Sequence, residues 1–211
     1  MTTIIRSANQ LDIPFIARAY VSAWREAYRG LVPERVLAAL EKSDPARQWR
    51  DCRRSRECDL MVADVNGEVV GFVAAGPARD PLLGADFEIY GIYVLKRFQY
   101  RGIGSRLMGA AATATQIHGA DSVGLWVARD DVAALAFFRA LGGAVGMARI
   151  GSMPGRSFIE MAVMWDPVTG LTLWDDRLTR LDRLPRMHAG DGGRSPRVAG
   201  TTAVLGVDPA A

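Results

Sequence analysis

The sequence predicts an α/β domain with a mixed, mostly antiparallel central sheet and helices on both faces. Strand-like segments outnumber the amphipathic helical segments that lie between them, in the order βααβββαβαββ, and this order favours a mixed sheet covered on both sides. Between two of the apolar segments stands Asn66-Gly67, a strong signal for a hairpin turn, which joins antiparallel strands.

In the first half of the chain, helical and strand patterns are separated by residues that commonly end helices. Pro14 lies in the first turn of an amphipathic helix, where its missing N–H costs little, and Gly30 follows the end of that helix. Pro45 is expected to divide the next helical region into two pieces. The predicted elements are a strand over 3–6, a helix over 12–28, a helical region over 34–56, and hairpin strands over 59–64 and 69–75.

The second half continues with the central strand and the remaining crossovers. Gly119 and the pair Gly142-Gly143 end two helices, and Asp130 or Asp131 is expected to cap the second of these. The predicted elements are strands over 87–94 and 122–127, helices over 102–118 and 132–141, and closing strands over 144–150 and 158–165, with a loop over 151–156.

The pattern divides the chain into a domain over 1–165 and a C-terminal extension over 166–211. The extension begins with a short amphipathic helix, and its remainder is rich in Gly, Pro, Ala and Ser without periodicity. We expect that remainder to be poorly ordered.

Composition excludes several classes of function. A net charge of +3 without a basic run gives no indication of nucleic-acid binding, and no uncharged apolar segment is long enough to cross a membrane. Cys52, Cys58, His118 and His188 are the only cysteines and histidines, so no metal site is expected. A soluble cytoplasmic protein with reduced thiols is the expectation.

The stretch from residue 87 to 107 carries the clearest functional pattern. Its strand is led by Glu88, and simple alternation would place Glu88, Tyr90, Ile92 and Val94 on one face. A loop with two glycines follows, and then a helix whose first N–H groups lack partners, which together favour binding of a phosphate. The third glycine of a dinucleotide fingerprint is replaced by Leu107, and no lysine follows a glycine as a Walker A loop requires. A turn without a ligand is the alternative.

The loop has the form Q/R-x-x-G-x-G/A and follows a strand of the form E-x-Y-x-I-Y-V. Over residues 3–165 the chain thereby resembles the GCN5-related N-acetyltransferases (the GNAT superfamily), at their acyl-CoA site. The resemblance implies that acetyl-CoA is the cosubstrate and that its pantetheine arm enters between two splayed parallel strands, the one ending at Val94 and the one over 122–127. The residues implied to contact the cosubstrate through their backbone or loop are Ile92, Tyr93, Val94, Gln99, Tyr100, Arg101, Gly102, Ile103, Gly104 and Ser105.

The resemblance also assigns catalytic positions. Glu88 matches the general base, which must take a proton from an amine before the amine can attack a thioester; the alternative is a Glu that positions substrate or pairs with an arginine. Asp131 and Phe138 stand where many members have an asparagine and a tyrosine that protonates the leaving thiolate. Phe138 has no hydroxyl, so water, Tyr90 or Tyr93 would replace it, or the thiolate would leave unassisted. The resemblance instead implies that Asp131 and Phe138 belong to the cosubstrate site, with the Phe138 ring packed against the cosubstrate.

The function implied is acyl-CoA-dependent N-acetyltransfer to a primary amine by direct attack, since no cysteine stands near the motif. The acceptor, a small molecule or a peptide amine, would enter between the loop near 24–33 and the loop over 151–157, past Glu26, Tyr28 and Tyr90. A non-catalytic acyl-CoA-binding or interaction module is the alternative. A homodimer through the extension is compatible with the sequence, and no nucleic-acid or membrane partner is expected.

Overall fold

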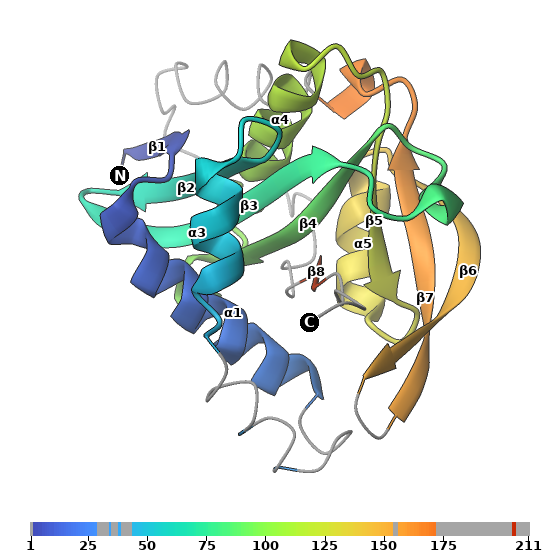
Figure 1. The fold of residues 1–211 in the computed structure, drawn as a ribbon, viewed down its shortest axis with the longest axis horizontal. Helices are drawn as coiled ribbons and strands as arrows, with labels where there is room; N and C mark the ends of the chain where they lie inside the picture. Colours follow the sequence, from blue (N-terminus) through green and yellow to red (C-terminus); the bar gives the residue numbers. More distant parts are fainter. Residues whose placement is uncertain are drawn as a thin grey trace, which may run out of the picture.

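The computed structural model describes residues 2–28, 34, 38, 44–153, 156–171 and 204–205 (Figure 1). Its strands are β1 (Thr3–Ser7), β2 (Asp59–Val65), β3 (Glu68–Pro77), β4 (Phe87–Val94), β5 (Val123–Ala128), β6 (Ala144–Met153), β7 (Arg156–Trp165) and β8 (Val204–Leu205). Its α-helices are α1 (Ile13–Tyr28), α3 (Arg47–Arg54), α4 (Ile103–Ile117) and α5 (Val132–Ala140). The predicted order of elements through residue 165 is confirmed.

One sheet organises the domain, with the strand order β1-β2-β3-β4-β5-β7-β6. Among the described strands, β4 and β5 form the one parallel pair, and every other pair is antiparallel. The β2–β3 hairpin turns at Asn66 and Gly67, which have φ of 54° and 86°. Both angles suit a hairpin turn whose twist matches that of the strands. The mixed, mostly antiparallel sheet is as predicted.

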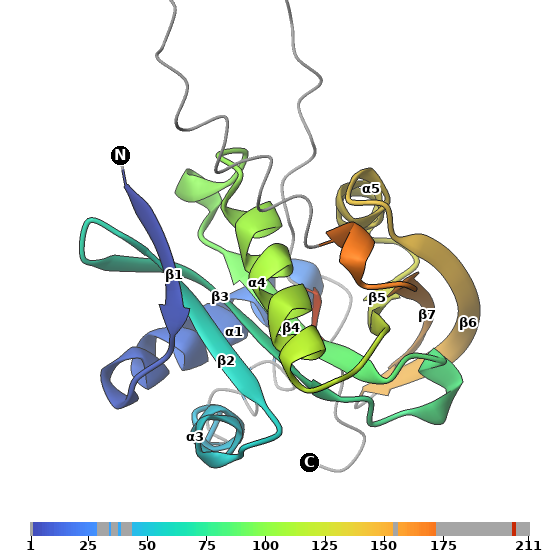
Figure 2. The same ribbon diagram turned by 90° about the horizontal axis from the view of Figure 1, so that it is seen from above.

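Helices cover both faces of the sheet, again as predicted (Figure 2). α1 and α3 pack on one face, where Ile16, Tyr20 and Trp49 meet Phe72 of β3. α4 and α5 lie on the other face and contribute Leu107 and Phe138, among others, to the larger part of the core. Each helix therefore buries the apolar stripe that its sequence predicted.

A β-bulge in β4 changes which side chains share a face. Ala74 of β3 pairs with Gly91 and Ala75 pairs with Ile89, so Tyr90 is an extra residue on β4. Beyond the bulge, Ile92 and Val94 pack in the core beneath α4, whereas Tyr90 packs toward α1 and α3. The expectation that Glu88, Tyr90, Ile92 and Val94 share one face is wrong, because alternation was counted through the bulge.

Several boundaries differ from prediction. Of the helical region predicted over 34–56, α3 is described, whereas residues 35–37 and 39–43 lie outside the described part. β6 and β7 continue into the predicted loop over 151–156, of which residues 154 and 155 are also outside. Val168 and Leu171, assigned by sequence to the extension, are buried in the core of the domain. The compact unit therefore extends beyond residue 165.

The two cysteines are joined. Cys52, near the end of α3, forms a disulfide with Cys58, which precedes β2, and their Cα atoms are 5.2 Å apart. The expectation of reduced thiols is wrong for this structure, because the chain returns from α3 to the sheet over six residues and brings the two side chains together.

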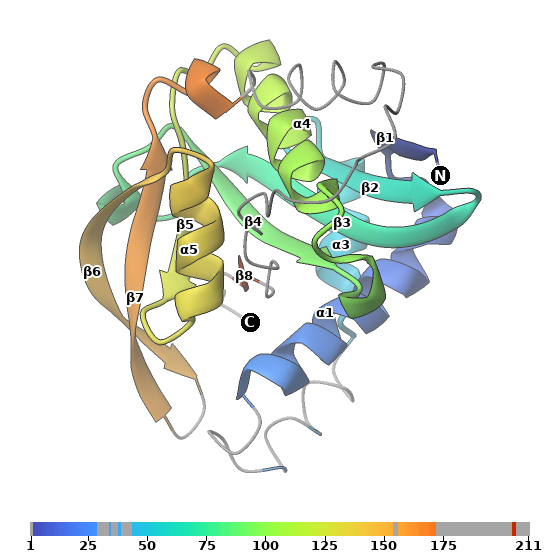
Figure 3. The same cartoon turned by 180° about the vertical axis from the view of Figure 1, so that it is seen from behind.

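The extension reaches back to the sheet at one point. Val204 and Leu205 form β8, which pairs antiparallel with Ile92 and Gly91 of β4 and also contacts β5. Figures 1 and 3 show β8 between these two strands. The rest of 172–211 lies outside the described part, so the order of the tail stays a prediction.

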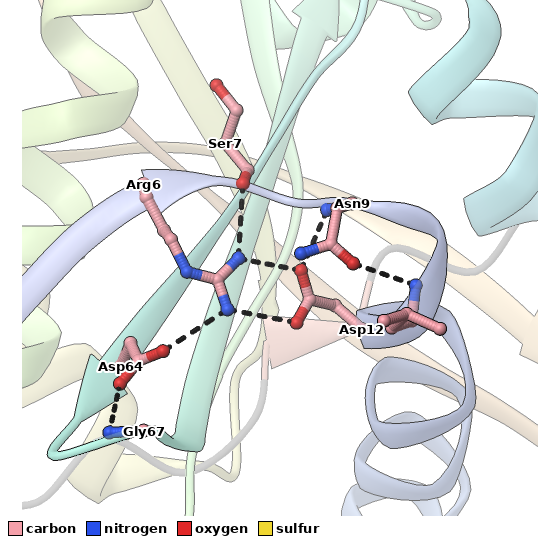
Figure 4. A network of polar contacts seen from close by, with 7 residues as sticks. Arg6, Ser7, Asn9, Asp12, Asp64 and Gly67 are labelled. Carbon is pink, nitrogen blue, oxygen red and sulfur yellow. Dashed lines mark hydrogen bonds and ion pairs between the residues drawn. The ribbon is translucent and has the colours of Figure 1, made fainter.

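A polar network fixes the first strand against the hairpin (Figure 4). Arg6 of β1 donates to both oxygens of Asp12, at 2.7 and 3.1 Å, and to Asp64 Oδ2 at 3.2 Å. Asp64 Oδ1 in turn accepts from the backbone N–H of Gly67 at 2.7 Å. One arginine thus ties the start of α1 to the β2–β3 turn.

Within the described ranges, no helix has both the length and the apolar character needed to cross a bilayer. The same ranges hold no group of three or more His, Cys, Asp and Glu side chains placed to bind a metal ion.

Candidate functional site

The sheet opens between its two parallel strands. β4 and β5 pair in two rows only, Phe87 with Val123 and Glu88 with Gly124. Beyond Glu88 the two strands separate, and β8 pairs with β4 instead (Figure 3). This is the gap that the sequence led us to expect between the strand ending at Val94 and the strand over 122–127. A linear ligand with amide groups would meet the β4 backbone there at Gly91 and Ile92, where β8 now pairs with it.

The start of the gap is fixed by Asp86, just before β4. Its Oδ2 accepts from the backbone N–H of Asp121 and of Ser122, each at 3.2 Å, and from the Ser122 hydroxyl at 2.8 Å. These bonds lower the pKa of Asp86, with the Ser122 hydroxyl as the largest cause. β4 and β5 are therefore held together at their first residues and free to separate afterwards.

The glycine-rich loop follows β4 and ends at the N-terminus of α4. Gln99 donates its side-chain N–H to the carbonyl of Val94 at 3.0 Å, which holds the loop against the end of the strand. Tyr100 and Gly102 have φ of 60° and 76°. These left-handed residues turn the chain sharply into α4.

The N-terminus of α4 has no side-chain cap, and its first helical bond runs from Arg106 N–H to the carbonyl of Gly102 at 3.1 Å. The N–H groups of Ile103, Gly104 and Ser105 therefore precede the hydrogen-bonded ladder, and the helix dipole adds partial positive charge there. This arrangement suits a pyrophosphate. The Arg101 guanidinium lies 5.5 Å from the centre of the Phe98 ring, within the same loop.

Glu88 is 2% exposed and is bonded to Arg79, a residue that the sequence analysis missed. The Arg79 Nε and backbone N–H each donate to Glu88 Oε2 at 3.1 Å, and a terminal nitrogen donates to Oε1 at 2.7 Å. A carboxylate has about four acceptor positions, and Arg79 uses three of them. The alternative in which Glu88 pairs with an arginine is therefore correct as geometry, and it leaves room for the base role.

Tyr90 lies beside this pair. The Arg79 guanidinium carbon is 4.2 Å from the centre of the Tyr90 ring, and the Tyr90 hydroxyl donates to the Pro77 carbonyl at 2.7 Å. Burial is the main cause that raises the pKa of Tyr90 to about 12. A phenol with a raised pKa gives up its proton less readily, so Tyr90 is a poor substitute for the missing acid at Phe138.

A pocket of about 310 Å³ lies between α1, α3 and β4 on the same side of the sheet. Tyr20, Trp49, Tyr90 and Arg79 line it, together with the Cys52–Cys58 disulfide. The aromatic rings and the nearby ion pair give it apolar walls and a polar end, as small-molecule sites commonly have. The side chains of Glu26 and Tyr28, and residues 29–33, lie outside the described part, so the predicted acceptor entrance is seen only from the Tyr90 side.

The remaining predicted residues cap a helix or pack in the core. Asp131 caps α5, with Oδ1 accepting from Ala134 N–H at 2.9 Å, and burial raises its pKa. Phe138 is 0% exposed and packs edge-on against Phe137 and Trp165. Tyr93 is buried on the side of α1 and α3, while Ile92 and Val94 are buried beneath α4. The side chains of Ile92, Tyr93 and Val94 are therefore buried on either side of the sheet, so any contact of these residues with the gap would be through the backbone.

Comparison with known proteins agrees with this geometry. The family profile described as "Acetyltransferase (GNAT) family" matches residues 19–143. The chain is 33% identical over 123 residues to an uncharacterized N-acetyltransferase, YuaI, of Bacillus subtilis, covering 58% of this chain and 70% of that protein. It is 31% identical over 136 residues to an uncharacterized N-acetyltransferase of Archaeoglobus fulgidus, covering 64% and 88%.

Among solved structures, the fold is similar to that of the PaiA N-acetyltransferase of Thermoplasma acidophilum, determined in complex with coenzyme A. The TM-score is 0.59 at 17% identity, over 76% of this chain and 98% of that one. The sheet that opens between β4 and β5, the uncapped α4 and the profile match over more than half of the chain lead to one conclusion. The chain belongs to the acetyltransferase (GNAT) family of enzymes.

Proposed function

We propose that the protein transfers the acetyl group of acetyl-CoA to a primary amine by direct attack. The observation that carries the proposal is the position of Glu88, which lies in the last paired row of β4 and β5, where the gap begins. The same strand leads into the loop and the α4 N-terminus suited to a pyrophosphate. One continuous segment thus supplies the cosubstrate site and a buried carboxylate.

In the proposed reaction, one N–H proton of the ammonium passes to Glu88, directly at Oε1 or through a water. The freed nitrogen attacks the thioester carbonyl carbon, the C–S bond breaks, and the CoA thiolate leaves. The nitrogen loses its second proton as the amide forms, and this proton passes through water to the thiolate. Arg79 holds Glu88 in one orientation throughout. Neither cysteine is available as an acyl-enzyme nucleophile, because both are in the disulfide.

We place the acceptor in the pocket lined by Tyr20, Trp49, Arg79 and Tyr90. Its volume suits a small amine or the end of a peptide. The proposal includes a cytoplasmic location, where acetyl-CoA is made, and a homodimer through the extension. The Cys52–Cys58 disulfide is the observation against a cytoplasmic location, because disulfides are rare in a reducing compartment. Cell fractionation tests the location, thiol labelling after acid quenching tests whether the bond forms in cells, and sedimentation equilibrium tests the dimer.

The decisive experiment is calorimetric titration of acetyl-CoA and CoA into the protein, followed by an amine panel with thiol release as the readout. Micromolar binding and amine-dependent release of CoA are expected. If neither acetyl-CoA nor CoA binds, the proposed cosubstrate site is refuted, and the loop over 99–104 is a structural turn.

A non-catalytic acyl-CoA-binding module is the second candidate. Phe138, which lacks the hydroxyl of a proton donor, and the three bonds from Arg79 to Glu88 favour it. Binding of acetyl-CoA without thiol release for any amine would identify this alternative.

A further inference from the structure

The loop between β3 and β4 carries two adjacent charged residues that bind opposite halves of the opened sheet. Arg79 is bonded to Glu88 of β4, as described above. The next residue, Asp80, forms an ion pair with Arg149 of β6, which lies beyond the gap. Because β4 and β5 pair in two rows only, this loop adds a polar link between the halves at a place where the ladder is short.

The guanidinium group of Arg149 is itself fixed in one orientation. Its Nε donates to Glu160 Oε2 at 2.7 Å, and its guanidinium carbon lies 4.0 Å from the centre of the Trp126 ring. Glu160 is 1% exposed, and burial is the main cause that raises its pKa. A planar guanidinium fixed by a buried carboxylate and an aromatic face presents its remaining N–H groups at defined positions.

Both carboxylate oxygens of Asp80 accept hydrogen bonds, and these bonds fix the orientation of the side chain. Oδ1 accepts from the backbone N–H of Leu82 at 2.9 Å, which starts a short turn over Pro81–Leu83, and Oδ2 accepts from Arg149. The backbone of residue 80 is therefore fixed between a local cap and a distant arginine. The preceding residue, Arg79, uses its own backbone N–H as well as its side chain to hold Glu88.

We propose that the Asp80–Arg149 ion pair positions Arg79 and, through it, the carboxylate of Glu88. Asp80 and Arg149 are positioning residues in this proposal, which rests on the proposed acetyltransfer. Burial of a charged Glu–Arg pair contributes little net stability on average, so stability alone does not explain the Glu160–Arg149–Asp80 chain.

The test variant is Asp80→Asn, because an asparagine Oδ1 still caps Leu82 while its NH₂ group cannot accept from Arg149. Glu160 keeps its partner, so no buried charge is left alone. The matched control is Asp64→Asn: Asp64 also accepts a backbone N–H at one oxygen and an arginine at the other, but in the β2–β3 hairpin (Figure 4).

With acetyl-CoA and an amine that supports thiol release, we expect Asp80→Asn to lower kcat about tenfold, with unchanged acetyl-CoA affinity, because small misplacements of a catalytic group are costly. Asp64→Asn should leave kcat unchanged. In a Glu88→Gln background, Asp80→Asn should cause no further loss. An equal loss in both backgrounds would overturn the proposal, because the ion pair would then act independently of Glu88.

A second measurement does not need activity. The Nε–H proton of Arg79, assigned through its loss in Arg79→Lys, should exchange slowly with water in the wild type, since it is bonded to buried Glu88. We expect exchange to accelerate about tenfold or more in Asp80→Asn and not in Asp64→Asn. Unchanged exchange would refute positioning even if the protein transfers no acetyl group. If the wild-type protein does not bind acetyl-CoA, the proposed function is refuted, but the positioning of Glu88 by the ion pair is not.

Discussion

Glu88 is almost completely buried, and Arg79 donates three hydrogen bonds to its carboxylate. Arg79 supplies the charge that makes burial of the carboxylate tolerable. Since a carboxylate has about four acceptor positions, Arg79 does not use all of them. In the proposed reaction, the remaining position on Oε1 is the one that takes the proton of the amine.

Glu88→Gln is expected to lower kcat at neutral pH about 100-fold or more, because it removes a proton acceptor and leaves shape unchanged. The loss should shrink at a pH where the amine is already neutral. Stopped-time thiol release across a pH series measures both effects. Glu68→Gln, an exposed residue in the β2–β3 hairpin, is the control and should behave as wild type. Wild-type rates in Glu88→Gln at every pH would contradict the base role.

Gly102 matters because it turns the chain into α4 with a φ of 76°. Gly102→Ala forces an L side chain into this conformation, which costs about 1–2 kcal/mol and shifts the N–H groups that follow. We expect a lower Tm and weaker CoA binding by calorimetry. Gly146→Ala, where the added methyl meets no atom within 4 Å, is the control. Unchanged CoA affinity in Gly102→Ala would show that these N–H groups do not bind the cosubstrate.

Sequence reasoning found Glu88 and the loop residues but not Arg79, Arg149 or Glu160. The first set lies within one continuous segment, where spacing reports geometry. The second set comes from a loop and two later strands, and these meet only when the sheet is built. The residues next to Arg79, Arg149 and Glu160 in the sequence form no motif with a distinctive spacing. No local pattern could therefore have identified these three residues.

At the scale of elements, the order and type of helices and strands could be predicted because apolar periodicity and turn residues agree along the chain. Register could not. The bulge at Tyr90 depends on how β4 fits β3 and β5, and a single extra residue moves every following side chain to the other face. β6 and β7 likewise extend further than their composition indicated, because each pairs with the other along most of its length.

The disulfide links α3 to the start of β2 and lines the pocket between α1, α3 and β4. A cross-link that closes a loop of about six residues contributes about 2 kcal/mol of stability in the chain-entropy description. Reductant, or replacement of both cysteines by serine, should lower the free energy of unfolding in urea by about this amount. Reductant should have no further effect on the double variant. Equal stability with and without reductant would show that the bond is absent in solution.

Asp86 links the first residues of β4 and β5 and gives the fold a specific acid sensitivity. Its pKa is lowered in the folded state, mainly by the Ser122 hydroxyl. The stabilising contribution is therefore present above the unfolded pKa of about 3.9 and is lost as pH falls through the folded value. Urea unfolding across this range should show a smaller pH dependence for Asp86→Asn than for wild type or for the exposed control Asp130→Asn. Identical dependence would contradict this assignment.

At the scale of the whole molecule, the sheet consists of two halves joined at one end. β1 to β4 form one half and β5 to β7 the other, with the Asp86–Ser122 bonds and two ladder rows between them. The helices on the two faces belong to different parts of the core. On the face covered by α4 and α5, one apolar cluster contains residues of both halves, so the two halves share their packing there.

β8 has a consequence for ligand binding, because a tethered segment is always present at high local concentration. It pairs with Gly91 and Ile92, the backbone that a pantetheine arm would meet. If β8 occupies this strand edge for part of the time, the site can bind its ligand only for the remaining time, and its apparent affinity is lower in proportion. Removal of residues 203–211 should therefore lower the calorimetric Kd for CoA a few-fold, with Tm unchanged, and an unchanged Kd would contradict the competition. The protein's response to acetyl-CoA would then depend on Val204 and Leu205, which would compete with the cosubstrate for one strand edge.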